Sequence, residues 1–130
     1  MTMHVDLVSP ERILYQGDAD LVIARTVGGG DVAFMTGHAP FVGALDICTV
    51  TIRSESGDQT AAVHGGFVEV SENRVTILSD VAELAHQIDV DRARAAKERA
   101  EQRLEDDHDV EAEAALRRAN TRLAISGALG

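Results

Sequence analysis

The sequence predicts an antiparallel β-sandwich or barrel over residues 1–87, followed by a helical hairpin of two antiparallel helices over residues 88–130. Three observations carry this prediction. Nine of the eleven glycines and both prolines lie in the first part, where short apolar runs alternate with turn residues. No glycine occurs from residue 67 to residue 126, and alanine is the commonest apolar residue after position 88. The apolar spacing there changes from the period of a strand to that of a helix.

Short apolar runs in the first part predict strands, because each run is bounded by residues that favour turns. The runs cover residues 5–7, 13–15, 21–23, 32–35 and 47–52. A parallel sheet needs long crossover connections, usually helices, and none is predicted in this region. We therefore expect antiparallel pairing throughout.

Residues 62–81 give the clearest prediction, a β-hairpin with one buried face. A polar break at residues 71–73 separates two alternating apolar runs, and Asn73 tolerates the positive φ that tight hairpin turns require. The residues expected to share a buried face on each strand are Val68 and Val70, then Val75 and Ile77. Gly65 and Gly66 just before them predict a bend or a close backbone approach.

Two helices are predicted after residue 88, each with a narrow apolar stripe made mostly of alanine. Asp89 and Asp109 precede them, and an aspartate carboxylate can accept the free amides of a first helical turn. The stripe residues are Ala93, Ala96, Ala100 and Leu104, then Ala112, Leu116, Ala119 and Leu123. Alanine buries little area, so such helices should be marginally stable alone. We expect them to dock on the sandwich, to bind something else, or to move between states.

Net charge and cysteine content exclude several classes of protein. A formal charge of −10 disfavours binding to nucleic acid and to anionic lipid, and makes a basic protein surface the better partner. Cys48 is the one cysteine, so no disulfide framework is possible, and its apolar surroundings predict a small buried side chain. No signal peptide and no run of about 20 apolar residues is recognisable. We expect a cytoplasmic protein without direct membrane insertion.

No catalytic motif is recognisable in the chain. Its five histidines show none of the spacings typical of metal sites, which disfavours a small metal-dependent β-fold enzyme. One cluster could bind an anion, because Asp89, Arg92 and Arg99 share one face of the first helix and Arg122 lies on the second. A helix cap with solvated arginines explains the same pattern, and spacing alone favours that alternative.

Four segments, taken in order, resemble the epsilon subunit of the bacterial F-type, proton-translocating ATP synthase. Each segment alone is weakly informative, but their order and spacing are specific. They are Val8-Ser9-Pro10-Glu11-Arg12-Ile13-Leu14-Tyr15-Gln16-Gly17, Gly37-His38-Ala39-Pro40-Phe41, Gly65-Gly66-Phe67-Val68-Glu69-Val70 and Val75-Thr76-Ile77-Leu78-Ser79-Asp80. The resemblance covers nearly the whole chain and implies a flattened β-sandwich followed by a helical hairpin.

The resemblance implies a non-catalytic subunit of the central stalk, the rotor that couples proton translocation to ATP synthesis. The implied partners are the gamma subunit and the membrane ring of c subunits, both bound by the sandwich, and the alpha/beta catalytic head. The C-terminal helices would reach that head and restrain ATP hydrolysis. Asp31 and His38 lie at positions that resemble contacts with the ring and with gamma. The implied location is the cytoplasmic face of the bacterial cell membrane, as a peripheral protein.

Some members of this family bind ATP through a motif at the start of the first helix, which Ile88-Asp89-Val90-Asp91-Arg92-Ala93 matches. The nucleotide site that the resemblance implies comprises Glu83, Ile88, Asp89, Arg92, Ala93, Arg99 and Arg122. ATP would be a regulatory ligand there, and no cofactor is required. The alternative function is a free-standing nucleotide-sensing module that uses the same helical hairpin.

Overall fold

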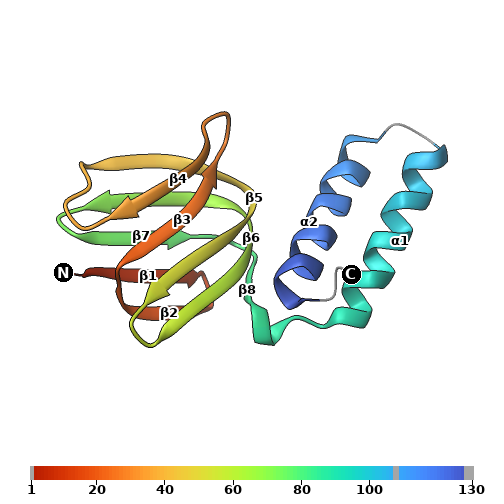
Figure 1. Ribbon diagram of the computed structural model, residues 1–130. Coiled ribbons are helices and arrows are strands. Elements are labelled where there is room, and N and C mark those ends of the chain that lie inside the picture. The colour runs from red at the N-terminus through yellow and green to blue at the C-terminus, as the bar shows by residue number, and fades with distance from the viewer. Residues whose placement is uncertain (1, 107–108, 128–130) are drawn as a thin grey trace.

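Eight strands in the described part of the chain form one continuous hydrogen-bonded sheet folded into two layers, and two helices pack against one side of it (Figure 1). The computed structural model describes residues 2–106 and 109–127. The strand order is β2-β1-β7-β6-β5-β3-β4, with β8 paired to β6. The strands are β1 (Met3–Ser9), β2 (Arg12–Ala19), β3 (Leu21–Thr26), β4 (Gly30–Met35), β5 (Phe41–Ser54), β6 (Gly57–Ser71), β7 (Arg74–Leu78) and β8 (Ala82–Leu84).

The long strands β5 and β6 contribute to both layers. The last part of β6 pairs with β7, whereas its first part pairs with β8. Gly65 and Gly66 divide these two parts with φ angles of 85° and 131°, which glycine adopts far more readily than other residues. A Cβ at Gly66 would lie 2.1 Å from the carbonyl oxygen of Leu78, so this position has no room for a side chain. The bend and close approach predicted at the two glycines are confirmed.

The predicted fold class, a β-sandwich followed by a helical hairpin, is confirmed. The expectation of antiparallel pairing throughout is wrong at one place, because β1 and β7 pair in parallel, with Val5 opposite Val75. The residues that connect these two strands contain no helix. Strands β2 to β6 carry the chain around the sandwich and return it beside β1, so the sandwich itself serves as the crossover.

The hairpin predicted around residues 71–73 is confirmed, and its turn depends on two residues. Strands β6 and β7 pair with Ser71 opposite Arg74, which leaves Glu72 and Asn73 as the turn. Both have positive φ, 51° and 58°, as the tightest hairpin turns require. The side-chain oxygen of Asn73 also accepts a hydrogen bond of 2.7 Å from the backbone N–H of Gly37. The turn is thereby tied to the loop between β4 and β5.

Aliphatic side chains fill the space between the two layers, as the low aromatic content predicts. Phe34 closes the core beside the rings of His38 and Phe41, at centroid distances of 5.0 Å and 5.5 Å. Cys48 is buried in the same core, as predicted, and burial raises the pKa of its thiol. The fully buried aliphatic residues include Val5, Leu7, Val22, Val50, Ile52, Val63, Val68, Val75 and Ile77.

Two helices and a short turn of 3₁₀ helix follow the last strand. Their bounds are η1 (Ala85–Gln87), α1 (Val90–Asp106) and α2 (Val110–Ser126). Both predicted caps are confirmed: Asp89 accepts from the backbone N–H of Arg92 at 3.1 Å, and Asp109 accepts from that of Glu111 at 2.8 Å. Helix α2 lies between α1 and the sandwich (Figure 1). The hairpin therefore docks on the sandwich, one of the outcomes expected for helices with an alanine stripe.

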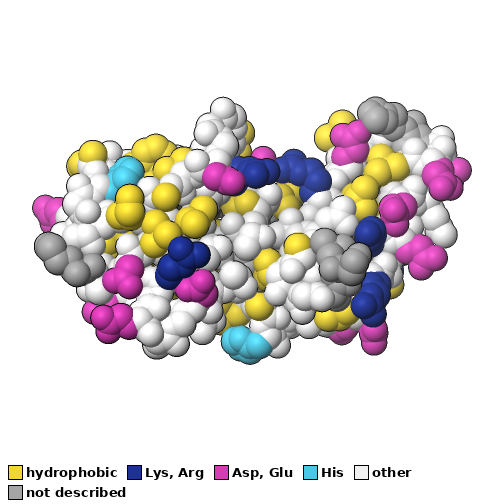
Figure 2. Space-filling model, viewed as in Figure 1, with side chains coloured by type: hydrophobic (Ala, Val, Ile, Leu, Met, Phe, Trp, Pro, Cys, Tyr) yellow, Lys and Arg dark blue, Asp and Glu magenta, His cyan; other side chains and the backbone are white. Residues whose placement is uncertain are grey.

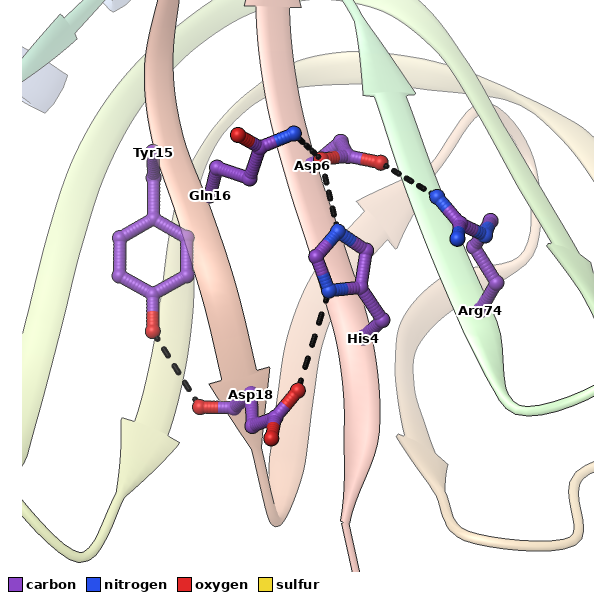
Figure 3. A network of polar contacts seen from close by, with 6 residues as sticks. All are labelled: His4, Asp6, Tyr15, Gln16, Asp18 and Arg74. Atoms are coloured by element: carbon purple, nitrogen blue, oxygen red, sulfur yellow. Dashed lines mark hydrogen bonds and ion pairs between the residues drawn. The ribbon is translucent and has the colours of Figure 1, made fainter.

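A polar network joins β1, β2 and β7 on the outer side of the sandwich (Figure 3). The Asp6 carboxylate accepts from Gln16 at 2.9 Å and from Arg74 at 3.2 Å, and a ring nitrogen of His4 lies 3.1 Å away. Burial raises the pKa of Asp6, but the hydrogen bonds from Gln16 and His4 outweigh burial and hold the pKa below its ordinary value. The ionised carboxylate therefore links three strands.

We predict that Gly66→Ala destabilises the sandwich much more than Gly57→Ala. Both glycines have positive φ, 131° and 120°, so both substitutions strain the backbone. A Cβ at Gly57 meets nothing within 4 Å, whereas one at Gly66 collides with the Leu78 carbonyl. The free energy of unfolding, measured by urea denaturation, should fall by about 2 kcal/mol more for Gly66→Ala. Equal losses of unfolding free energy in the two variants would show that the nearby Leu78 carbonyl is not the reason for glycine at position 66.

Asp6→Asn is expected to lower the free energy of unfolding by about 1–2 kcal/mol at pH 7, because charge-assisted hydrogen bonds become neutral ones. The difference from the wild type should shrink as the pH falls through the native pKa of Asp6, below 3.8, where the wild-type carboxylate is also neutral. Denaturant titrations at several pH values measure both effects. Asp18→Asn is the control, since Asp18 is 70% exposed and 3.8 Å from His4. Similar losses in both variants would contradict the central role of Asp6.

Candidate functional site

Helix α2 docks on the outer face of β5, β6 and β8 through small side chains and charges. Ala62 lies on the face of β6 that points away from the core and is 0% exposed. Two ion pairs span the contact: Arg122 Nε lies 2.5 Å from Glu83 Oε1, and Arg117 lies 2.6 Å from Asp46 Oδ1. The hydrogen bond from Arg117 lowers the pKa of Asp46 although burial opposes it. The dock thus differs from the sandwich core, which is filled by large aliphatic side chains.

A cleft of about 460 Å³ opens between the start of α1, the end of α2 and β8. Six of the seven residues that the resemblance implies for a nucleotide site line it, namely Glu83, Asp89, Arg92, Ala93, Arg99 and Arg122. Ile88 is not among its lining residues and lies in extended backbone between η1 and α1. Residues from three separate segments therefore meet in one place.

The cleft carries unpaired positive charge. Asp89 caps α1, and Glu83 is paired with Arg122, whose side chain is only 24% exposed. Arg92 and Arg99 are exposed, and their guanidinium groups have no hydrogen-bond or ion-pair partner among the described residues. Lys and Arg side chains gather along the boundary between the sandwich and the hairpin (Figure 2). In a chain of formal charge −10, this arrangement is suited to an anion such as a phosphate group.

The cleft is also lined by three residues that the resemblance did not imply, namely Val81, Gln87 and Ala96. The Gln87 side-chain oxygen accepts a hydrogen bond of 3.0 Å from the backbone N–H of Leu84, which fixes the path of η1. Ala96 belongs to the predicted alanine stripe, so its helical spacing was a usable signal. Val81 and Gln87 had no such signal, because their places depend on how the chain travels from β7 to α1.

The described residues lack two kinds of feature. No group of three or more His, Cys, Asp or Glu side chains among them could hold a metal ion. Within residues 2–106 and 109–127, no helix is both long and apolar enough to cross a membrane.

The two positions implied for contacts with other subunits lie away from the cleft. Asp31 pairs across the β3–β4 ladder with Arg25, at 3.0 Å between Arg25 Nε and Asp31 Oδ1. His38, in the loop between β4 and β5, donates from Nδ1 to the Ala39 carbonyl at 2.7 Å and meets the Phe34 ring edge-on. Asp31 therefore already has a cationic partner within the chain, and the Ala39 carbonyl and the Phe34 ring fix the orientation of the His38 ring.

Strand register aligns exposed apolar side chains across the layer that contains β2, β1, β7, β6 and β5. Ile13 lies opposite Val8, Val8 opposite Leu78, Leu78 opposite Phe67, and Phe67 opposite Ala44. Ile13, Leu78 and Phe67 are 59%, 52% and 60% exposed. We call these five residues the apolar row. A contiguous exposed apolar surface of this kind is typical of a protein-binding site.

Two family matches together span residues 2–127. Residues 2–85 match the beta-sandwich domain of the ATP synthase delta/epsilon chain, and residues 86–127 match its long alpha-helix domain. The ATP synthase epsilon chain of Halalkalibacterium halodurans is 44% identical over 131 residues, which cover 97% of this chain and 98% of the relative. The epsilon chain of Streptomyces griseus subsp. griseus is 46% identical over 122 residues, which cover 93% and 92%.

Two solved structures share the fold. A chain in the cryo-EM structure of the Euglena gracilis mitochondrial ATP synthase, OSCP/F1/c-ring, has a TM-score of 0.72 at 22% identity, covering 98% of this chain and 79% of that one. A chain of the Tetrahymena thermophila mitochondrial ATP synthase, in a structure of its central stalk and c-ring, has a TM-score of 0.56 at 19% identity, covering 100% and 98%. Both similarities extend over the sandwich and the hairpin of this chain.

A β-sandwich joined to a helical hairpin, matched in both parts, defines a small subunit of the ATP synthase class. The chain belongs to the ATP synthase delta/epsilon chain family, and the two bacterial relatives are epsilon chains of that family. The resemblance inferred from four sequence segments is thereby confirmed.

Proposed function

We propose that this chain works in the central stalk of a bacterial F-type ATP synthase, without an active site of its own. There it couples proton translocation to ATP synthesis and restrains ATP hydrolysis. The observation that carries the proposal is the family match over both parts of the chain, together with 44% and 46% identity to epsilon chains. A fold relative from Tetrahymena thermophila comes from a structure of a central stalk and c-ring, which supports the same assignment.

The apolar row supports binding of the gamma subunit by the sandwich. Phe67 is exposed at the row, and aromatic anchors contribute much of the binding free energy in protein interfaces. Val42, 73% exposed, lies two residues before Ala44 on β5 and so extends the same face toward the loop that holds His38. We infer that gamma covers the row, with His38 at the margin of the contact.

The tip of the β3–β4 hairpin is the part of the sandwich that we assign to the ring of c subunits. It presents Asp31 and Val27, which are 61% and 63% exposed. A basic loop of the ring would compete with Arg25 for the Asp31 carboxylate, so one exposed ion pair would replace another. Such an exchange contributes little free energy and weakens as the salt concentration rises.

The way the hairpin docks supports a restraining role for the C-terminal helices. Two ion pairs span the contact with the sandwich, and the buried β6 residue on that face is the small Ala62, so we expect the free-energy cost of undocking to be low. We infer that the helices leave the sandwich and extend along gamma toward the alpha/beta catalytic head, where they block hydrolysis. The complete subunit would then act as a peripheral protein on the cytoplasmic face of the cell membrane.

The cleft supports ATP as a regulatory ligand. The unpaired Arg92 and Arg99 can bind phosphate oxygens, and Arg122 can exchange Glu83 for phosphate. A nucleotide held there would contact α1, α2 and β8 at once and would favour the docked hairpin. The same cleft favours the second candidate function, a free-standing nucleotide-sensing module. Binding to gamma distinguishes the two, because only the stalk subunit requires it.

Phe67→Glu is expected to weaken binding to the gamma subunit of the same organism at least about tenfold, because the interface would bury an unpaired charge. Isothermal titration or co-elution on a sizing column measures this. Val110→Glu is the matched control, since Val110 is 77% exposed at the start of α2, outside the sandwich layer that carries the row. Unchanged binding by a folded Phe67→Glu variant would contradict docking at the row. Failure of the wild type to bind gamma would contradict the stalk assignment and favour the nucleotide-sensing module.

We expect magnesium ATP to bind the purified chain, and Arg99→Ala to weaken that binding at least about tenfold, because a charged hydrogen bond to phosphate is lost. Isothermal titration calorimetry gives the affinities. Arg94→Ala removes the same charge from the same helix at an exposed residue that does not line the cleft. Equal losses in both variants would indicate only general electrostatic attraction. A wild type that fails to bind millimolar ATP would reject ATP as a ligand and leave the stalk proposal intact.

A further inference from the structure

His64 lies at the joint between the sandwich and the hairpin. It directly precedes the bend at Gly65 and Gly66, and its side chain shares the face of β6 that carries Ala62, away from the core. Both ring nitrogens are shielded from solvent, yet neither has a hydrogen-bond partner among the described residues. A buried polar group without a partner costs free energy, so a change in the protonation of this ring would change the stability of the surrounding contact.

Charged groups from the hairpin and the sandwich act electrostatically on the His64 ring. Helix α2 contributes Arg118 and Arg122, and β8 contributes Glu83, which is already paired with Arg122. The segment between β7 and β8 places Asp80 on a hollow of about 280 Å³ that His64 also borders. On β5 the residue opposite His64 is apolar. The arginines of α2 therefore oppose any positive charge on the ring while the hairpin is docked.

We propose that His64 is a pH-sensitive latch between β6 and α2: the hairpin docks over a neutral His64 ring, and protonation of that ring releases it. This inference goes beyond the proposed function, because it concerns docking within the isolated chain. It requires neither a bound nucleotide nor a partner subunit. Acid would thus act directly on the equilibrium between docked and released helices.

The direction of the effect follows from how docking changes the ring. In the docked state the pKa of His64 is lowered to about 4, mainly by burial, while Arg122 and Arg118 also lower it and Glu83 raises it. When the helices leave, the ring is exposed and its pKa returns to about 6.5. Docking is therefore strongest above a pH of about 6.5 and weakens as the pH falls toward about 4. At pH 5.5 the docking constant should be about tenfold lower than at pH 8.

A second ion pair of the dock helps to isolate the effect of His64. The hydrogen bond from Arg117 lowers the pKa of Asp46, so that carboxylate stays ionised between pH 5.5 and pH 8. The Arg117–Asp46 pair therefore persists over the range in which the His64 ring would gain its proton.

Hydrogen exchange in the full chain, without nucleotide, tests the proposal. The protection factor of the α2 amides compares the measured exchange rate with the intrinsic rate at the same pH, so it reports the opening of the dock. We expect it to fall about tenfold between pH 8 and pH 5.5 in the wild type, and to stay constant in His64→Gln. His86→Asn is the matched control, because His86 is exposed on η1, and it should follow the wild type.

Two results would overturn the latch. One is a wild-type protection factor that does not change with pH, and the other is an equal change in His64→Gln. A direct NMR titration of the wild-type histidine rings covers the case in which His64→Gln fails to dock. A His64 ring that titrates near the pKa of an exposed histidine, about 6.5, while α2 stays protected would also overturn the proposal.

Discussion

The bend in β6 at Gly65 and Gly66 is the constraint on which the remaining arrangement depends. Before the bend, β6 pairs with β8 and supports the hairpin; after it, β6 pairs with β7 and supports the apolar row. His64 and Phe67 stand on either side, three positions apart in the chain, yet one lies under α2 and the other is exposed on the row. One backbone feature therefore separates the surface proposed for assembly from the surface on which the helices rest. The two surfaces still adjoin, because His64 borders the same hollow as Val8, Phe67 and Leu78 of the apolar row.

The two halves of the molecule are held together by different forces. Large aliphatic side chains fill the sandwich, and the Asp6 network adds charge-assisted hydrogen bonds across three of its strands. The hairpin is joined to it by ion pairs and by small residues such as Ala62. Local opening takes the lowest free energy where buried apolar contacts are fewest. The hairpin is consequently the part of the chain best able to respond to a ligand or to a proton while the sandwich stays folded.

Features that depend on neighbouring residues could be predicted from the sequence. The positive φ of Asn73 and the caps formed by Asp89 and Asp109 follow from side-chain chemistry within a few positions. Most of the cleft could also be anticipated, from helical spacing and from the family motif. The parallel pairing of β1 with β7, the apolar row and the surroundings of His64 could not, because each requires strands that are distant in sequence to lie in a known register. Gln87 joins the cleft for the same reason, since only the path of η1 brings it there.

The parallel pairing of β1 with β7 also determines when the chain can fold. Strand β1 lies between β2 and β7, so its layer remains open until almost all of the sandwich has been synthesised. Closing so long a segment is entropically costly and gains its contacts only at the end, which makes formation of the sandwich a late and cooperative event. The helices leave the ribosome after that point and meet a surface that can already be complete. The order of synthesis thus matches the order of folding, because the helical hairpin is synthesised last and docks on a sandwich that has already folded.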